Sequence, residues 1–139
     1  MDSNRLVIIN KAREYLGVPY RHQGRTHLGL DCIGLLIAIW RDTGLAYDDF
    51  NGYGENADIK TMAKKLDKHF IRIRGEPLPG DVFWMRAIDG LERHLALYTE
   101  NNTIIHSTNW GSKRVVEHRY TPQDKAKTFG ILRWKGFID

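Results

Sequence analysis

The amino-acid sequence predicts an α+β fold in which helices come first and an antiparallel sheet follows. Up to about residue 68, apolar residues recur with helical spacing between capping residues. From residue 69 onward they fall into short runs separated by turn residues. Because the helical and strand-like patterns are segregated along the chain, the strands are expected to pair antiparallel. With 139 residues, 42% of them hydrophobic and 27% charged, and no internal repeat, we expect one domain over residues 1–139.

The first helix is expected over residues 4–16. Ser3 is suited to cap its N-terminus, because a serine side chain accepts hydrogen bonds from the first backbone N–H groups. Gly17 follows in the position that favours a left-handed C-terminal cap, and Pro19 cannot continue a helix. Residues 17–30 are rich in glycine, arginine and histidine, and they are expected to form an irregular loop.

A second helix is expected from the apolar run that extends from Cys32 to Trp40. Periodicity alone does not distinguish a buried helix from a buried strand in this run. Asp31 before the run and Gly44 after it favour the helix, since they suit its N-cap and its C-terminal cap. After a turn-rich stretch, residues 58–68 show the spacing of a further amphipathic helix.

The second half of the chain contains six candidate strands, so the N-terminal helices are expected to pack on a central antiparallel sheet of about five or six strands. The candidate strands are His69–Ile73, Asp81–Arg86, His94–Tyr98, Thr103–His106, Arg114–Glu117 and Phe129–Trp134. The turns between them are expected at Pro79-Gly80, Asp89-Gly90, Asn101-Asn102 and Gly111.

Composition and charge exclude several classes of protein. A single cysteine rules out an intramolecular disulfide framework and any metal site that needs two thiolates. The net charge is +4, but basic residues are scattered among acidic ones, so no nucleic-acid partner is expected. The longest apolar run has nine residues, whereas a membrane span needs about 20, so no membrane partner is expected. The N-terminus has no recognisable secretory signal, and we expect synthesis in the cytoplasm.

The single cysteine, Cys32, is a candidate nucleophile because it would lie in the first turn of the second helix. Unpaired backbone N–H groups and the helix dipole at that position favour a thiolate over a thiol. The same N–H groups can stabilise an oxyanion that forms when a carbonyl is attacked. The alternative is a free cysteine that serves as a small apolar residue of the core.

A cysteine nucleophile needs a base, and His94 and His106 are the best candidates among the six histidines. His94 begins one candidate strand and His106 ends the next, so a hairpin would bring both side chains to the same end. One histidine would then act as the base and the other would orient it. The remaining histidines lie in the 17–30 loop or, for His69 and His118, beside charged residues that suggest the surface.

A zinc site built from two histidines and a carboxylate is a second possibility for these residues. The sequence has no His-Glu-x-x-His or Cys-x-x-Cys spacing, which are the patterns that commonly hold this metal. We therefore expect neither a metal nor an organic cofactor.

Five motifs, in order along most of the chain, resemble those of the NlpC-type cell-wall peptidases, which are papain-like cysteine endopeptidases. The motifs are Leu16-Gly17-Val18-Pro19-Tyr20, Asp31-Cys32-Ile33-Gly34-Leu35, Pro79-Gly80-Asp81-Val82, His94-Leu95-Ala96-Leu97-Tyr98 and Ile104-Ile105-His106-Ser107. The resemblance implies a papain-like fold and a hydrolase that uses a cysteine.

The resemblance also implies roles for individual residues. Cys32 would be the nucleophile, His94 the base and His106 the residue that orients the base. Tyr20 matches a tyrosine near the oxyanion, and Asp31 matches an aspartate that helps to hold the free amine of the substrate. The family usually cleaves the bond between D-γ-glutamate and a diamino acid in peptidoglycan stem peptides, so a peptidoglycan stem peptide is the expected partner.

Two departures from the family pattern bear on the choice of substrate. Ile33 stands where the family has a serine that helps to bind substrate, and His22-Gln23-Gly24 replaces a Trp-Gly-Gly segment. The segment Arg21-His22-Gln23-Gly24-Arg25 most resembles family members encoded among phage tail genes. Phage tail proteins are therefore expected as further partners, and a virion would carry the enzyme to the bacterial cell wall. Two alternatives stay open, namely a non-catalytic tail-assembly or wall-binding protein, and a thiol amidase or acyltransferase with another substrate.

Overall fold

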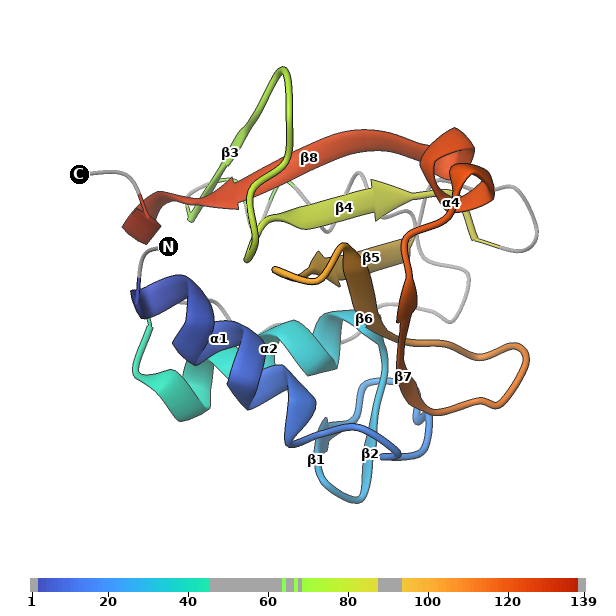
Figure 1. Cartoon of the computed structure of the whole chain (residues 1–139). Coiled ribbons are helices and arrows are strands. Elements are labelled where there is room, and N and C mark those ends of the chain that lie inside the picture. The colour runs from blue at the N-terminus through green and yellow to red at the C-terminus, as the bar shows by residue number, and fades with distance from the viewer. Residues whose placement is uncertain (1–2, 46–63, 65–66, 68, 88–93, 138–139) are drawn as a thin grey trace.

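Two helices pack against one face of a six-stranded antiparallel sheet in the computed structural model of the chain (Figure 1). The structure describes residues 3–45, 64, 67, 69–87 and 94–137. The helices precede the sheet in the sequence, so the α+β class predicted from the segregated patterns is confirmed. Most of the predicted 58–68 helix lies outside the described residues.

Helix α2, Cys32–Thr43, is the central buried helix of the fold, and its two caps are those predicted from the sequence. The Asp31 carboxylate accepts a hydrogen bond from the Gly34 N–H at 2.7 Å. At the other end, Gly44 adopts the left-handed conformation with φ 75°, which a residue without a Cβ adopts at low cost. The helix continues beyond Trp40 to Thr43, and its first turn presents Cys32.

Helix α1, Ser3–Arg13, lies beside α2 and ends earlier than the sequence predicts. Ser3 is its first residue rather than the cap before it. Beyond Arg13 the chain tightens into turns, in which the Leu16 N–H bonds the Arg13 carbonyl at 3.2 Å. The Gly17 N–H then bonds the Val115 carbonyl at 2.9 Å. This bond to a strand draws the chain away from the helix axis and explains the early end.

All six predicted strands are present, with ends that differ from the prediction by a few residues, and their spatial order is β3-β8-β4-β5-β6-β7. Their bounds are β3 Phe70–Arg72, β4 Val82–Met85, β5 His94–Tyr98, β6 Thr103–Ser107, β7 Val115–Arg119 and β8 Thr128–Trp134. The last strand therefore inserts between β3 and β4.

Three short elements were missed by the sequence prediction. A small hairpin of β1, Arg25–Thr26, and β2, Gly29–Leu30, lies within the predicted 17–30 loop. Helix α4, Pro122–Lys127, has no buried residue and therefore no apolar periodicity to reveal it. It is fixed instead by a capping box between Thr121 and Asp124. A 3₁₀ turn, η1, Lys135–Phe137, ends the described chain.

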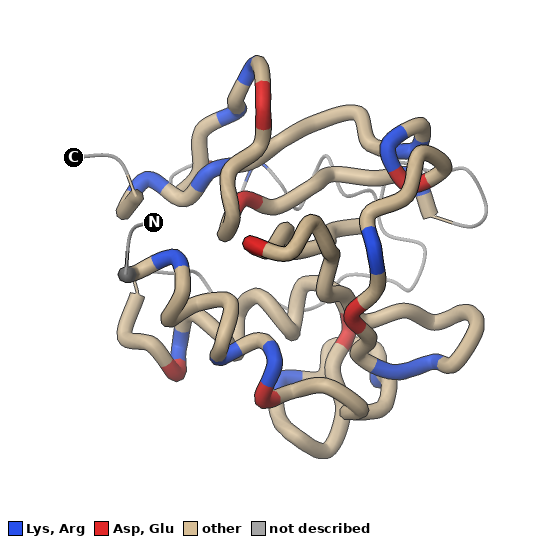
Figure 2. The backbone as a smooth tube through the Cα atoms, viewed as in Figure 1, with Lys and Arg blue, Asp and Glu red and all other residues tan. Residues whose placement is uncertain are grey.

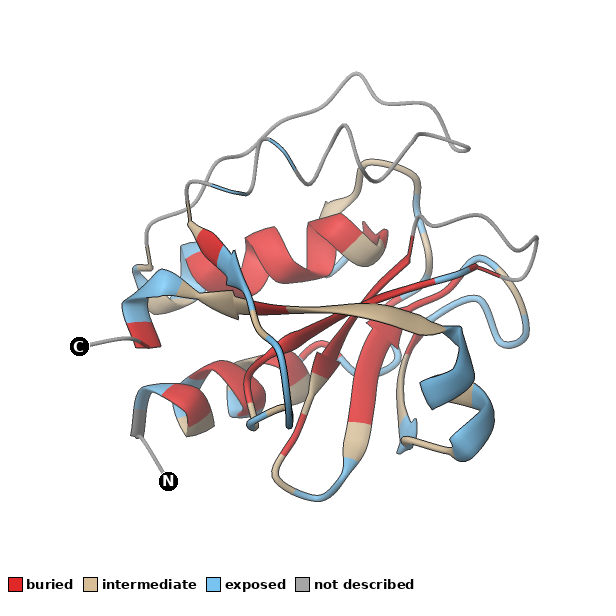
Figure 3. Cartoon of the chain, turned by 90° about the horizontal axis from the view of Figure 1, so that it is seen from above, coloured by how far each residue is buried: buried red, intermediate tan, exposed pale blue. Residues whose placement is uncertain are grey.

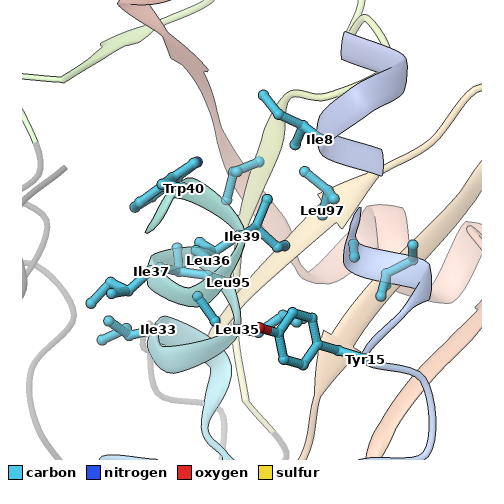
Figure 4. Close-up of a cluster of buried hydrophobic side chains, with 14 of the residues drawn as sticks. Ile8, Tyr15, Ile33, Leu35, Leu36, Ile37, Ile39, Trp40, Leu95 and Leu97 are labelled. Atoms are coloured by element: carbon cyan, nitrogen blue, oxygen red, sulfur yellow. The ribbon is translucent and has the colours of Figure 1, made fainter. Parts of the chain in front are cut away.

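The hydrophobic core lies between the two helices and the sheet, and α2 contributes most of it. Ile37 and Ile39 are fully buried, and each such side chain contributes about 2 kcal/mol by leaving water. Figure 3 shows buried residues concentrated in α2 and the central strands. Figure 4 shows side chains of α2 packed with Leu95 and Leu97 of β5 and with Ile8 and Tyr15 from the N-terminal segment.

A buried carboxylate connects the start of β4 to β8 and α1. Asp81 is fully buried and accepts two hydrogen bonds from the Arg133 guanidinium, at 2.9 and 2.8 Å. It also accepts the Leu78 N–H at 2.8 Å and lies 3.3 Å from Nη1 of Arg5. These contacts explain why an aspartate follows Pro79-Gly80 in the turn that leads into the sheet.

Charged residues are distributed over helices, strands and loops rather than gathered in one segment (Figure 2). Among the described residues, the helices are too short or too polar to cross a lipid bilayer.

Candidate active site

Cys32 occupies the first turn of α2, where this partly buried residue packs against the hydrophobic core. Backbone hydrogen bonds from Leu95, Ile33 and Cys32 itself favour the thiolate, as expected for a helix N-terminus. Burial, followed by the negative charge of Asp31, outweighs them and raises the pKa of the thiol to about 12. The expectation of a resting thiolate is therefore wrong for this state, and Cys32 is a neutral thiol.

His94 and His106 lie together at the same end of the β5–β6 hairpin, as the sequence predicts. Nε2 of His94 is 2.6 Å from Nδ1 of His106, and both residues are buried. The strand register pairs Leu97 with Ile105 and Tyr98 with Ile104, so both histidines fall on the same face of the sheet. The backbone of Leu95, which follows His94, reaches the Cys32 sulfur. The fold thus brings the start of β5 to the start of α2.

His118 extends this arrangement, and sequence reasoning missed it. Nε2 of His118 lies 2.9 Å from Nε2 of His106, and Nδ1 of His118 lies 2.9 Å from the Arg119 carbonyl oxygen. The side chain of His118 is 43% exposed, so the predicted surface position is confirmed, but the sequence did not reveal its contact with the buried His106. Because His106 pairs with Val116 across β6 and β7, His118 is its diagonal neighbour on the same face. Only the strand register reveals this contact.

His106 is held as a neutral imidazole. Burial, and then repulsion from His118, lower its pKa to about 3, which the nearby Asp124 opposes only in part. A neutral imidazole has one N–H and one acceptor nitrogen, so His106 can accept a hydrogen bond on one side while it donates one on the other.

Trp110 is a second residue of the site that the sequence did not reveal. Its ring lies edge-on to His94, with ring centroids 4.9 Å apart, and its centroid is 6.5 Å from that of His106. Trp110 itself is half-buried. The indole therefore covers one side of the histidine pair and restricts the orientation of His94.

Asp31 has a structural role that occupies much of its carboxylate. Besides capping α2, it accepts the Gln23 N–H at 2.8 Å, and Nη1 of Arg25 lies 3.4 Å from Oδ1. Nδ1 of His22 is 4.0 Å from Oδ2. A substrate amine would therefore share this carboxylate with the Arg25 guanidinium. The role of Asp31 in holding an amine stays a prediction.

Close backbone contact fixes the loop that precedes Cys32. A Cβ on Gly34 would collide with the Gly24 carbonyl, and a Cβ on Gly24 would collide with the Gly29 carbonyl. Gln23 adopts a left-handed conformation with φ 60°, which suits a glycine better.

Tyr20 and Ile33 are held in different ways. The Tyr20 backbone forms a parallel bridge with Leu30, just before Asp31, and its N–H donates to the Lys113 carbonyl at 2.8 Å. Its side chain is half-buried, and its role near an oxyanion stays a prediction. Ile33 is 2% exposed and packs in the core, so the residue that replaces the family's serine is a packing residue.

Within the described ranges, no group of three or more histidine, cysteine, aspartate and glutamate residues is arranged to hold a metal ion. The candidate site therefore consists of one thiol, a buried histidine pair and a third, exposed histidine.

The fold and the site together define a papain-like domain, with a cysteine at a helix N-terminus and two histidines on the hairpin that faces it. The chain belongs to the NlpC/P60 family, which matches residues 17–133. The resemblance drawn from the sequence motifs is therefore confirmed.

A curated relative, described as probable endopeptidase NlpC of Escherichia coli strain K12, is 30% identical over 107 residues. The match covers 76% of this chain and 63% of that protein. A family protein from Bacillus cereus has the same fold with a TM-score of 0.70 and 22% identity, over 94% of this chain and 40% of the other. The peptidoglycan hydrolase RipB of Mycobacterium tuberculosis matches with a TM-score of 0.65 and 19% identity, over 92% of this chain and 62% of the other.

The same fold also serves a protein without catalytic activity. RipD of Mycobacterium tuberculosis, described as a non-catalytic NlpC/p60 domain protein adapted to bind peptidoglycan, matches with a TM-score of 0.61 and 15% identity. The match covers 92% of this chain and 90% of RipD. Fold alone therefore does not separate a hydrolase from a binding protein, and the side chains of the site must decide.

Proposed function

We propose that this chain is a cysteine peptidase that hydrolyses the peptide stems of bacterial peptidoglycan. The observation that carries the proposal is the histidine pair, with Nε2 of His94 2.6 Å from Nδ1 of His106, on the strand whose backbone reaches the Cys32 sulfur. Such a pair supplies both a base and the group that orients it. The homologous endopeptidase and peptidoglycan hydrolase support the reaction class and the substrate.

The proposed reaction begins from a neutral thiol. His94 removes the proton as the Cys32 sulfur attacks the amide carbonyl of the substrate, and a carbon–sulfur bond forms. The Cys32 N–H and the Tyr20 hydroxyl are the proposed donors to the oxyanion, and removing one such donor costs about 3 kcal/mol of transition-state stabilisation. His94 then protonates the leaving amine as the carbon–nitrogen bond breaks. Water, deprotonated by His94, hydrolyses the thioester and restores the thiol.

The bond that we propose is the one between D-γ-glutamate and a diamino acid. This part of the proposal rests on the family resemblance, in which an aspartate at the position of Asp31 holds the free amine of the peptide. The Arg25 guanidinium, 3.4 Å from Asp31, would have to give way to that amine. Peptides with and without a free N-terminal amine, compared by kcat/KM, test this point. Equal values would argue against a role for Asp31 in binding the amine.

The decisive test of function is replacement of the thiol. Cys32→Ala is expected to abolish release of new termini from purified sacculi and from γ-glutamyl-diaminopimelate peptides, because it removes the single thiol of the chain. Products are measured by mass spectrometry. A matching thermal unfolding midpoint for the variant shows that the fold is intact. Undiminished hydrolysis by folded Cys32→Ala would eliminate the mechanism.

A non-catalytic, wall-binding protein is the second candidate function. The raised pKa of Cys32 and the occupied carboxylate of Asp31 are the observations that favour it. It predicts that the wild-type protein sediments with sacculi but releases no product from them, by analogy with RipD, the non-catalytic protein adapted to bind peptidoglycan. A thiol amidase or acyltransferase would instead act on another acyl acceptor, and product masses would reveal a transferred acyl group.

We further propose that the protein is made in the cytoplasm and reaches the wall on a phage tail. The support for this proposal is the likeness of Arg21-His22-Gln23-Gly24-Arg25 to family members encoded among tail genes. Mass spectrometry of purified virions, induced from the host strain, tests it, because the proposal requires tryptic peptides of this chain in the particle. Virions without such peptides would contradict it.

A further inference from the structure

Three imidazole rings form one continuous series from the buried site to the molecular surface. Nε2 of His94 is 2.6 Å from Nδ1 of His106, and Nε2 of His106 is 2.9 Å from Nε2 of His118. The series ends at Nδ1 of His118, which lies 2.9 Å from the Arg119 carbonyl oxygen. The first two histidines are buried, whereas the third is 43% exposed on β7.

The end of the series fixes the position of every proton along it. A carbonyl oxygen only accepts hydrogen bonds, so Nδ1 of His118 must carry a hydrogen and donate it. The carboxylate of Asp124, 3.9 Å from the same nitrogen, is also an acceptor. In a neutral His118, Nε2 is then bare and accepts the hydrogen bond from Nε2–H of His106.

The same reasoning continues into the buried pair. A neutral His106 that donates through Nε2 has a bare Nδ1, which accepts from Nε2–H of His94. A neutral His94 with its hydrogen on Nε2 has a bare Nδ1. That nitrogen is the only remaining base atom of the ring, and it is the one that the proposed reaction needs to remove the proton of Cys32.

We propose that His118 is a positioning residue, which acts through His106 to hold His94 in the tautomer whose Nδ1 carries no hydrogen and can accept a proton. The inference rests on the proposed function for its catalytic consequence, but the tautomers themselves can be observed without turnover. His118 makes its contribution from the surface strand β7 and does not touch the reacting atoms.

A hydrogen-bond donor facing His106 from position 118 reverses the direction of both hydrogen bonds in the series. If Nε2 of His118 carries a second hydrogen, it opposes the hydrogen on Nε2 of His106. His106 must then move its hydrogen to Nδ1, and His94 must move its own from Nε2 to Nδ1, which removes the base. The groups that face His118 are His106 from β6, the Arg119 carbonyl from β7 and Asp124 from α4.

Three substitutions separate these roles, and the exposure of His118 makes the folded state tolerant of them. His118→Gln keeps an acceptor oxygen, because its amide can turn to present it, and His118→Lys offers only donors. His118→Leu offers neither. Arg114→Gln, at an exposed position beside the start of β7, is the matched surface control.

For turnover of a γ-glutamyl-diaminopimelate peptide, we expect kcat of the variants to follow the ability of the side chain at position 118 to accept a hydrogen bond. His118→Gln should keep kcat within about threefold of wild type, whereas His118→Lys should lose about 100-fold or more in kcat with little change in KM, as for a wrong histidine tautomer. His118→Leu should fall between them, and Arg114→Gln should match wild type. Equal kcat for His118→Gln and His118→Lys would overturn the proposal.

The imidazole ¹⁵N shifts of histidine-labelled protein at neutral pH provide the second readout. Wild type and His118→Gln should show His94 protonated at Nε2, and His118→Lys should show it protonated at Nδ1. An unchanged His94 tautomer in His118→Lys would overturn the proposal. If the tautomer changes as expected while wild type releases no product from peptidoglycan, the positioning role stands and the proposed peptidase function fails.

Discussion

At the scale of single residues, the site combines a neutral thiol, reached by the backbone of Leu95, with a series of hydrogen-bonded histidines that begins at the neighbouring His94. Burial raises the pKa of Cys32 to about 12 and lowers that of His106 to about 3, so both groups are uncharged at neutral pH. A neutral resting site avoids the cost of a buried charge before substrate arrives. In the proposed reaction, a neutral thiol must transfer its proton from Cys32 to His94. The tautomer of His94 then determines whether a ring nitrogen can accept that proton.

The buried His106 predicts a specific loss of stability in acid. Its folded-state pKa of about 3 lies below the usual value of 6.5, so between these values only the unfolded state binds the proton. Its contribution to stability is therefore present above pH 6.5 and is lost as the pH falls toward 3. The loss is at most about 1.4 kcal/mol per pH unit for one proton.

The check is to compare wild type with His106→Gln, which keeps hydrogen-bonding atoms but does not titrate. Urea unfolding from pH 7.5 to about 4.5 should give a free energy of unfolding that falls more steeply for wild type than for the variant. Since the other histidines are common to both proteins, the difference in slope reports on His106. Parallel curves would contradict the assignment of its low pKa.

At the scale of elements, two connections position the site. The caps of α2 fix where Cys32 begins the helix, and the β5–β6 hairpin fixes the two buried histidines. The Asp81 network then holds the start of β4, the strand next to β5, against β8 and the first turn of α1. Because Asp81 is fully buried, the charges of its two arginine partners depend on it for compensation.

Asp81→Asn should destabilise the fold by about 3 kcal/mol, since it leaves Arg133 and Arg5 without a buried countercharge. Glu14→Gln is the matched control, because it breaks the largely exposed pair between Lys11 and Glu14 and should hardly change the free energy of unfolding. The free energy of unfolding in urea measures both. A loss for Asp81→Asn no larger than that of the control would refute the structural role of this carboxylate.

At the scale of the whole molecule, the sequence predicts those elements of the fold and the site that depend on local residue patterns. Caps and apolar spacing reveal α2, and turn residues between short apolar runs reveal the hairpin that joins His94 to His106. The raised pKa of Cys32 was not predictable, because it results from tertiary burial that outweighs the local effect of the helix. The contact of His118 was not predictable either, since it depends on the register between β6 and β7.

The central claim is that Cys32 is the nucleophile of a peptidase, and the covalent intermediate tests it most directly. Wild-type protein mixed with a γ-glutamyl-diaminopimelate peptide and quenched in acid during the first turnover should carry the γ-glutamyl acyl group as a thioester. Peptide mapping by mass spectrometry should locate it on Cys32 and find none in Cys32→Ala. An acyl group on any other residue, or turnover that survives in folded Cys32→Ala, would contradict the account.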